Sequence, residues 1–494
     1  MTAIEVVGGD PLDRAADALV VGVFTGGIEG PGVATVIQGL GLASLPLTPS
    51  FRGDIGQHLL LASPGLPCAT VLFVGLGRMV ATDAARLREA ARVAGSSGVL
   101  SGRVVTTLAL VHPSPSVVGA VAEGFLLGAA DHARTGRCDD DPPTVDRITI
   151  LAPTAMRSDG SHAVRRARAL ATAATATRDL VDTPPNLQSP AALAGQITDL
   201  TAGVCGADLH RTAALERARF GGLLGVGSGA GQAPCLLELR YEPADPLGHV
   251  VLCGRGTTFG SGGLGLRRDD TITTGKADMA GAAVIAAACA GLATLDVRVR
   301  VTALLGLVEH MPGCDAQRPG DVVTTRGGTT IEVTDASADA VLVLADLVDL
   351  ARAYEPDAIV DVATVGGGTA AALGRDAGAV LGTDDRLVDD LLAAAEAAGE
   401  PLWRLPLWDH MDRALQSPVA DVVNDHGAAG GAAIVAGLLL RRVARDVPWA
   451  HIDCGDAAFV PHGREDRPPG ATGYGTRTLL GWLEQRTPPD TTVR

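Results

Sequence analysis

Short apolar runs alternate along this chain with longer alanine-rich segments, and this alternation is the feature that most restricts its fold. Residues 18–24 (ALVVGVF), 70–77 (TVLFVGLG) and 103–111 (RVVTTLALV) have the composition of buried strands. Between them, residues 81–98 (ATDAARLREAARVAGSSG) repeat their apolar positions with helical spacing. Strands that alternate with helices in this way predict an α/β layer structure with a largely parallel sheet.

The alternation resumes after a long helical segment, which divides the chain into two predicted domains. Residues 163–185 (AVRRARALATAATATRDLVDTPP) have a helical pattern that two prolines stop. Strand-like runs then recur as far as residues 449–455 (WAHIDCG). A chain of 494 residues is long enough for more than one domain. We expect an N-terminal α/β domain at residues 1–165 and a C-terminal α/β domain at residues 166–494.

Charge and hydropathy exclude several classes of partner. The formal net charge of −16 and the pI near 5.1 argue against binding to nucleic acid. Apolar runs stay shorter than about 18 residues, so no membrane span is expected. The N-terminus carries acidic residues early and has no basic region before an apolar run, so it does not resemble a signal peptide. Cysteines are scattered without a C-x-x-C pair, which is typical of reduced thiols, and we expect a cytoplasmic protein.

The second predicted domain contains, in this order, the segments RDLVDTPPNLQSP, CGRGTTFGSGGLGLRR, KADMAGAA, EHMPGCDAQRPGDVV, DVATVGGG and WAHIDCG. Together and in this order, these segments resemble the M17 leucyl aminopeptidase (cytosol aminopeptidase) family. The resemblance implies a macro-like N-terminal α/β domain and a C-terminal aminopeptidase-type α/β domain with a mixed central sheet. It also implies a homohexamer. A mixed oligomer with a paralogue stays open as an alternative, as does a small molecule or a peptide as ligand.

Members of the family that this chain resembles hydrolyse peptides with two divalent cations, zinc or manganese, that share a bridging water. The family motif G-K-G-x-T-F-D-S-G-G-x-x-x-K corresponds to residues 254–267. Its metal-binding lysine falls at Arg255, whose guanidinium stays protonated and has no lone pair for a metal. Its bridging aspartate falls at Gly260, which removes a carboxylate. Its catalytic lysine falls at Arg267, whose positive charge could still polarise an oxygen.

The other site positions fall in KADMAGAA and in residues 331–346 (IEVTDASADAVLVLAD), which look like a strand end, an acidic turn and an apolar helix. Asp278 keeps a ligand aspartate of the family, although its carboxylate could instead cap the following helix. Ser337 replaces a second ligand aspartate, and Asp339 replaces a bridging glutamate. Val341 replaces the arginine that holds a bicarbonate. By resemblance, the substrate pocket includes Thr364, Gly366 and Gly367.

These substitutions predict that the dinuclear centre is lost. Only Asp278 and Asp339 remain as carboxylates, so we expect no tightly bound cofactor and at most one weak divalent cation. Because an unpaired buried acid is costly, we expect the Arg255 guanidinium to occupy the vacated metal space and to pair with Asp278 or Asp339. Our main hypothesis is a family homologue without peptide hydrolysis, acting as a structural, regulatory or ligand-binding oligomer.

Two alternatives stay open at this point. The chain could be a divergent, active metal-dependent aminopeptidase that releases N-terminal amino acids from peptides. Such an enzyme would need substitute metal ligands, for which the candidates are Glu309, His310 and Asp335.

The other alternative is a scaffold co-opted for different chemistry. The glycine-rich segment GRGTTFGSGG could bind an anion through its backbone N–H groups, with help from Arg255 and Arg267. A cysteine nucleophile, Cys253 or Cys454, could also act with His451, although buried packing explains these residues better.

Overall fold

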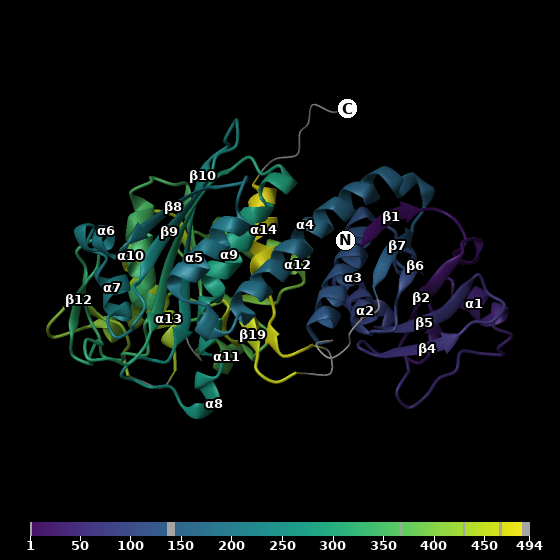
Figure 1. Cartoon of the computed structure of the whole chain (residues 1–494), viewed down its shortest axis with the longest axis horizontal. Coiled ribbons are helices and arrows are strands. Elements are labelled where there is room, and N and C mark those ends of the chain that lie inside the picture. Colours follow the sequence, from purple (N-terminus) through teal and green to yellow (C-terminus); the bar gives the residue numbers. More distant parts are fainter. Residues whose placement is uncertain (1, 136–143, 366–367, 428–429, 464–466, 487–494) are drawn as a thin grey trace. The chain divides into compact units, whose positions relative to one another are not determined.

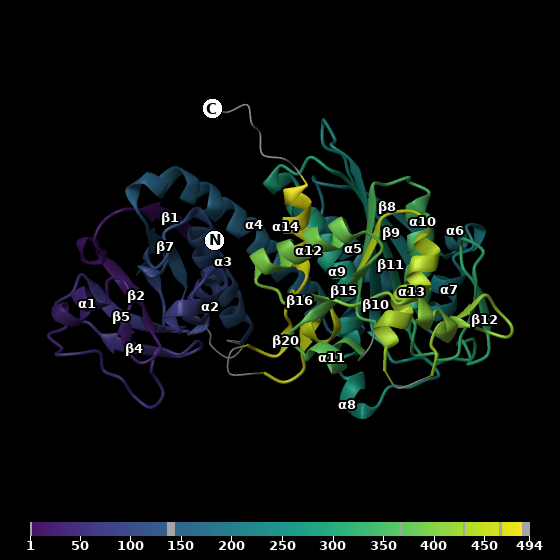
Figure 2. The ribbon, with the colours of Figure 1, turned by 180° about the vertical axis from the view of Figure 1, so that it is seen from behind.

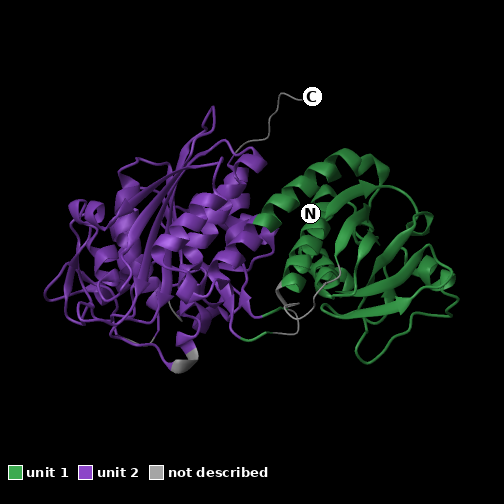
Figure 3. Ribbon diagram, viewed as in Figure 1, with its two compact units in different colours: residues 1–172, 462–468 green, residues 173–461, 469–494 purple. Residues whose placement is uncertain are grey.

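The structure is a computed structural model that describes residues 2–135, 144–365, 368–427, 430–463 and 467–486. It divides into two compact units, one of residues 1–172 with 462–468 and one of residues 173–461 with 469–494 (Figure 3). The division falls within helix α4 (Arg157–Asp182), and the division that we expect at residues 165 and 166 lies in the same helix. The predicted long helix is therefore present, and it ends at Asp182, just before the two prolines.

The first unit is built on a seven-stranded mixed sheet. Its strands follow the order β1-β7-β6-β2-β5-β4, with β3 paired to β2. The pairs from β1 to β5 in this order are parallel, whereas β4 and β3 are antiparallel to their neighbours. The strands are β1 (Ala3–Val7), β2 (Ala16–Phe24), β3 (Ile28–Glu29), β4 (His58–Ala62), β5 (Cys68–Gly77), β6 (Gly102–Thr106) and β7 (Val145–Leu151).

Helices cover both faces of this sheet. One core joins the sheet to α2 (Ala84–Ser96), α3 (Pro115–Thr135) and the first half of α4, and another joins it to α1 (Val33–Gly39). One detail of the prediction is wrong. The segment RVVTTLALV is a strand only to Thr106, and Leu108–Leu110 form a 3-10 helix. Strand β6 pairs with β2 and β7 no further than Thr106, so the chain turns where its partners stop, although its sequence continues to be apolar.

The second unit contains an eight-stranded mixed sheet with the order β16-β15-β18-β14-β10-β11-β9-β8. The central strands β18, β14, β10 and β11 are parallel, and β15 and β9 run antiparallel to them. These strands are β8 (Gly206–Arg211), β9 (Cys235–Tyr241), β10 (His249–Gly260), β11 (Arg300–His310), β14 (Ala358–Ala363), β15 (Gly378–Gly382), β16 (Leu402–Arg404) and β18 (Trp449–Asp453). Small sheets are formed by β12 (Val322–Thr324), β13 (Thr330–Glu332) and β17 (Val422–Val423), and by β19 (Phe459–Val460) and β20 (Gly470–Ala471).

Helices also cover both faces of the central sheet in this unit. Helices α5 and α9 pack on one face, with α14 against α9, and they lie in front of the sheet in Figure 1. Helices α7, α10 and α13 pack on the opposite face, where α10 and α13 come to the front in Figure 2. The helices are α5 (Pro190–Leu200), α6 (Thr212–Arg217), α7 (Gly221–Gly227), α8 (Asp269–Ile272), α9 (Ala280–Gly291), α10 (Ala340–Arg352), α11 (Gly368–Leu373), α12 (Asp385–Ala398), α13 (Ala432–Ala444) and α14 (Thr476–Gln485).

Two features of this unit position the candidate site. Strand β10 approaches α9 closely at Gly254, where a Cβ atom would lie 2.9 Å from Ala282 Cα, so the glycine permits the packing. The segment 331–346 contains the end of β13, a turn and the start of α10, as its sequence predicts. Among the described residues, no helix is long and apolar enough to cross a membrane.

Candidate functional site

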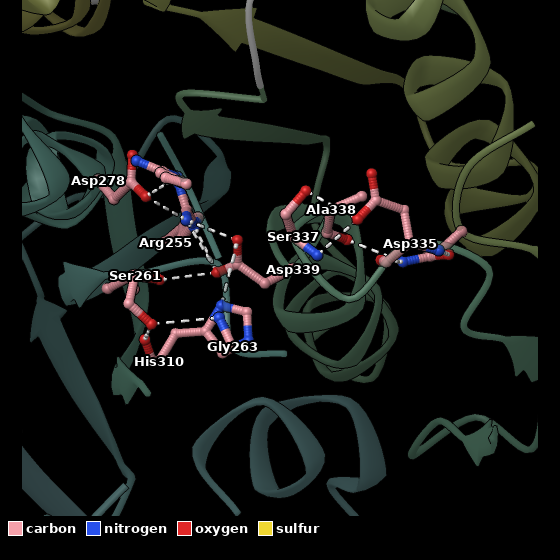
Figure 4. Close-up of polar contacts among 12 residues, drawn as sticks. Arg255, Ser261, Gly263, Asp278, His310, Asp335, Ser337, Ala338 and Asp339 are labelled. Carbon is pink, nitrogen blue, oxygen red and sulfur yellow. Dashed lines mark hydrogen bonds and ion pairs between the residues drawn. The ribbon is translucent and has the colours of Figure 1, made fainter. Parts of the chain in front are cut away.

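The centre of the candidate site is the side chain of Arg255, which strand β10 carries into the interior with 1% of its surface exposed. Its guanidinium lies between two carboxylates from different elements (Figure 4). Nη2 donates to Asp278 Oδ2 at 2.9 Å and to Asp339 Oδ1 and Oδ2 at 2.8 Å. Nε donates to Asp339 Oδ2 at 3.2 Å. The ion pair expected from the sequence is present, and it involves both aspartates instead of one.

The remaining nitrogen of this guanidinium is also satisfied. Nη1 donates to the backbone oxygen of Thr364 at 2.9 Å and to its hydroxyl at 3.0 Å. The same hydroxyl donates to Asp278 Oδ1 at 3.2 Å. Thr257 lies two residues beyond Arg255 on strand β10, and its Oγ1 donates to Asp339 Oδ2 at 3.1 Å. Each nitrogen of Arg255 therefore has an oxygen partner, which makes the buried charge tolerable.

Electrostatics agree with this geometry. Burial alone would lower the pKa of Arg255, but the charges of Asp278 and Asp339 outweigh it and hold that pKa above its ordinary value. Burial would raise the pKa of Asp339, whereas the charge of Arg255 keeps it below the ordinary value. Burial also lowers the pKa of His310, whose Nδ1 lies 3.8 Å from Asp339 Oδ1. Arg255 and Asp339 are thus ionised partners beside a histidine that favours its neutral form.

A second guanidinium joins the network through Asp278. Arg267 Nη2 donates to Asp278 Oδ2, the same oxygen that accepts from Arg255. The backbone N–H of Arg267 donates to Ser261 O at 2.9 Å, which fixes the loop that carries it. A Cβ atom at Gly260 would overlap Asp278 Oδ2 and would lie 3.2 Å from Arg267 Nη2. The absence of a side chain at Gly260 therefore provides the room that this pairing needs.

The helix-cap interpretation of Asp278 is wrong. Asp278 lies in a 3-10 helix at Gly275–Met279, and helix α9 begins two residues later without a hydrogen bond from a capping side chain. Its carboxylate instead accepts from Arg255, Arg267 and Thr364. Attraction to two guanidiniums outweighs the weaker gain from capping backbone N–H groups.

The acidic turn before α10 supplies only one residue to this network. Asp339 immediately precedes α10 and points to Arg255, whereas Asp335 accepts from Ser337 N and Ser337 Oγ, both at 2.8 Å (Figure 4). Val341 is buried in the core between α10 and the sheet. Ser337 therefore forms local hydrogen bonds with Asp335, and Val341 packs in the hydrophobic core.

The dinuclear metal site that the resemblance implies does not fit these residues. Cations would need the oxygens of Asp278 and Asp339. Both carboxylates are already bound to the guanidinium of Arg255, which stays protonated. Arg255 and Arg267 are donors without a free electron pair. Within the described ranges, no three His, Cys, Asp or Glu side chains are grouped so that they could hold a metal ion.

Within the described part of the chain, two of the three candidate substitute ligands form no hydrogen bond or ion pair with Asp278 or Asp339. Asp335 bonds to Ser337, and Glu309 is half-buried, with a pKa that burial raises. Only His310 lies beside Asp339. Of the residues expected in the substrate pocket, Thr364 belongs to the Arg255 network, while Gly366 and Gly367 lie outside the described residues.

In the alternative with a cysteine nucleophile, both candidate thiols are buried in this structure. Cys253 and Cys454 have no exposed surface, and burial raises the pKa of both well above the ordinary value. His451 Nδ1 is paired with Asp361 on the neighbouring strand. This arrangement is a buried ion pair in the sheet, as the packing interpretation predicts.

Comparison with known proteins agrees with the motifs. Residues 175–480 match the sequence model of the "Cytosol aminopeptidase family, catalytic domain", and residues 20–132 match that of the "Cytosol aminopeptidase family, N-terminal domain". A "Probable cytosol aminopeptidase" of Syntrophotalea carbinolica is 36% identical over 496 residues, covering 97% of this chain and 99% of that protein. One of Micrococcus luteus is 36% identical over 496 residues, with 96% and 97% covered.

Solved structures show the same similarity. The "Bottromycin maturation enzyme BotP" superimposes with a TM-score of 0.82 at 35% identity, over 95% of this chain and 99% of that one. A second structure of that enzyme, in complex with Mn, gives the same values. The two family models match residues in both halves of the chain, and the relatives span almost its whole length. The chain therefore belongs to the cytosol aminopeptidase family.

Proposed function

We propose that this family member does not hydrolyse peptides through a dinuclear metal centre, and that it acts as a non-catalytic structural, regulatory or ligand-binding oligomer. One observation carries the proposal. The guanidinium of Arg255, 1% exposed, lies between the two carboxylates that remain of the family's ligand set and bonds to both.

Competition between this guanidinium and a metal ion favours the guanidinium. It is covalently attached, so it is always present at the site and loses little freedom when it pairs. A cation would have to displace it into a closed interior, where its desolvated charge would lack a partner. With Gly260 and Ser337 at two ligand positions, few protein oxygens remain to offset that cost.

The experiment is a measurement of metal content and activity on the purified full chain. The protein is incubated with Mn²⁺ or Zn²⁺ and desalted, and its metal is counted by inductively coupled plasma mass spectrometry. Hydrolysis of leucine p-nitroanilide is followed in the same samples, beside a family member with the complete motif. We expect much less than one metal per chain and no chelator-sensitive cleavage. Two metals per chain together with cleavage that a chelator abolishes would reject the proposal.

A second candidate function is a divergent, active metal-dependent aminopeptidase. Its support is the set of relatives named probable cytosol aminopeptidases, at 35–36% identity over nearly the whole chain, and the similarity to BotP in complex with Mn. This candidate requires that Arg255 leave the carboxylates when metal binds. A metal-soaked crystal structure distinguishes the two, because the active enzyme would show the Arg255 side chain displaced and metal ions on Asp278 and Asp339.

The assembly and location of the chain follow from family membership as proposals. We propose a homohexamer, or a mixed oligomer with an active paralogue, in the cytoplasm, because relatives are named cytosol aminopeptidases. Native mass spectrometry of the recombinant chain gives its stoichiometry. Affinity purification from the native host shows whether a paralogue is incorporated.

A further inference from the structure

Two cysteine side chains from distant parts of the sequence meet in the second unit. Cys205 lies in the turn between α5 and β8, and Cys289 lies in the last turn of α9. They are 84 residues apart, yet Cys205 Sγ donates to the backbone oxygen of Cys289 at 4.0 Å. A hydrogen bond also links the two thiols themselves. Both cysteines are free in this structure, so the pair is a reduced dithiol.

The backbone holds both cysteines in place. The N–H of Cys205 donates to Thr201 O at 3.0 Å, which fixes the turn at the end of α5. Cys289 belongs to a helix, and its backbone oxygen also accepts from Leu292 N at 3.3 Å. Helices α5 and α9 pack against each other (Figure 1). A disulfide requires two side chains that already point toward each other, and two thiols that share a hydrogen bond do so.

The two thiols differ in access and in acidity. Cys205 is partly exposed, whereas Cys289 has 1% of its surface exposed. The hydrogen bond from the Cys289 thiol lowers the pKa of Cys205, against the opposing effect of burial. The same hydrogen bond, together with burial, raises the pKa of Cys289 well above its ordinary value. Because the thiolate is the reactive form, Cys205 is the sulfur that an oxidant from solvent reaches and oxidises first.

We propose that Cys205 and Cys289 form a modification site for hydrogen peroxide, which converts them reversibly into a disulfide. The Cys205 thiolate attacks one oxygen of the peroxide, the O–O bond breaks, and the hydroxide that leaves takes a proton and becomes water. The sulfur of Cys289 then attacks the sulfenic acid on Cys205. The S–S bond forms, the S–O bond breaks, and the proton of the Cys289 thiol leaves with the hydroxide as a second water. The peroxide accepts the two electrons that the thiols give up, and a thiol reductant returns the pair to its reduced form.

The disulfide would cross-link α9 to the turn before β8. It would close a loop that contains β9 and β10, the strand that carries Arg255. Such a bond restricts the unfolded chain far more than the folded one, so we expect oxidation to stabilise the second unit. The proposal holds whether or not the chain hydrolyses peptides.

The test is a peptide map of the purified full chain after oxidation. The reduced protein is treated with a small excess of hydrogen peroxide, its remaining thiols are blocked with N-ethylmaleimide in urea, and the digest is analysed by mass spectrometry. We expect a pair of peptides linked through Cys205 and Cys289, which is lost when dithiothreitol is added before the blocking step. Recovery of both cysteines as blocked thiols would overturn the proposal, as would sulfinic acid at Cys205 beside a free Cys289.

Variants assign the two roles. In Cys289→Ser, the sulfenic acid on Cys205 has no thiol to attack it, so dimedone should capture several-fold more of it than in the wild type. In Cys205→Ser, Cys289 should remain a free thiol after the same treatment. Cys314→Ser is the matched control, because Cys314 is exposed in the loop after β11, and this variant should form the disulfide as the wild type does. Equal capture of Cys205 in Cys289→Ser and in the wild type would contradict the role of Cys289.

Thermal unfolding gives a second measurement. The oxidised wild type should unfold about 5 °C or more above the reduced protein, and dithiothreitol should reverse this rise. Cys205→Ser should unfold at the same temperature before and after peroxide treatment. A rise of equal size in Cys205→Ser would show that the stabilising oxidation lies at another residue, and the assignment to this pair would be wrong.

Discussion

Replacement of Arg255 by methionine tests most directly whether its guanidinium is the internal counter-ion of the site. Methionine has a similar length and apolar stem but carries no charge and no N–H donors. In the variant, the Asp278 carboxylate keeps Arg267 and the Thr364 hydroxyl as partners. Among the described residues, the Asp339 carboxylate keeps only the Thr257 hydroxyl and the nearby His310. Asp339 is 2% exposed, so it cannot recover its lost partner from water without a local opening.

The expected loss of stability follows from the fact that Asp339 loses its positively charged partner Arg255. Removal of one member of a buried ion pair typically costs about 3–5 kcal/mol, because the remaining charge is left uncompensated. A domain is stabilised by roughly 5–15 kcal/mol, so Arg255→Met should remove a large part of the stability of the second unit. The double variant Arg255→Met with Asp339→Asn should regain most of the loss, because the residual buried charge is then neutral.

Tryptophan fluorescence is the appropriate assay, since all four tryptophans, at positions 403, 408, 449 and 482, lie in the second unit. Urea unfolding followed by this signal therefore reports on the unit that contains the site, which avoids mixing two transitions. Arg318→Met is the matched control. Arg318 forms an exposed pair with Asp321, so its replacement should leave the midpoint unchanged.

A small effect would refute the reasoning. If Arg255→Met lowers the free energy of unfolding by less than about 1 kcal/mol, the carboxylates do not depend on this guanidinium. If the added Asp339→Asn substitution destabilises the variant further, Asp339 is stabilised by some other positive group. In either case, Arg255 would not be the group that neutralises the buried carboxylates of the site.

Three further predictions use the same protein. Gly260→Asp should destabilise the second unit more than Gly260→Ala in urea titrations, because both side chains overlap Asp278 Oδ2 but only aspartate adds a negative charge. Mn²⁺ should raise the thermal midpoint of Arg255→Ala but not of the wild type, since the removed guanidinium exposes the oxygens of Asp278, Asp339 and Thr364; an equal rise in both would contradict this. Burial alone would lower the pKa of His451, but the charge of Asp361 outweighs burial and raises that pKa. The contribution of the His451–Asp361 pair to the free energy of unfolding should therefore be complete below about pH 6.5, and it should be lost as the pH rises through the pKa of the folded state. Urea titrations at several pH values in this range should show that the free energy of unfolding of the wild type depends on pH, and that this dependence is weaker in Asp361→Asn.

Much of the site could be predicted because its residues lie in motifs with apolar flanks. The turn at residues 333–339 is bounded by a strand end and by helix α10, so the positions of Ser337, Asp339 and Val341 follow from their neighbours. Pairing of Arg255 with an acid could be expected from chemistry alone, since neither group is stable when buried without a partner.

Contacts that depend on side-chain direction could not be predicted in the same way. Asp278 precedes a helix, and acidic residues at that position commonly cap helices, so local sequence favours the wrong partner. Only the folded chain brings Arg255 and Arg267 to one oxygen of this carboxylate. A cavity that Trp482 helps to line was harder still to predict from the sequence, because its lining comes from several segments between residues 247 and 486 that share no motif.

The residues at positions 255, 260 and 267 depend on one another, and this limits how metal ligands could be introduced at these positions. Lysine at position 255 alone would leave Arg267 on Asp278 and no carboxylate at position 260. Aspartate at position 260 alone would overlap Asp278 as the two guanidiniums now hold it, and would add a charge to a group that is already balanced. Lysine at position 255 would keep its charge beside Asp278 and Asp339, and aspartate at position 260 would collide with Asp278, so neither single change completes a set of metal ligands. A functional centre would need these positions and Ser337 to change together, so the network as it stands is self-consistent without metal.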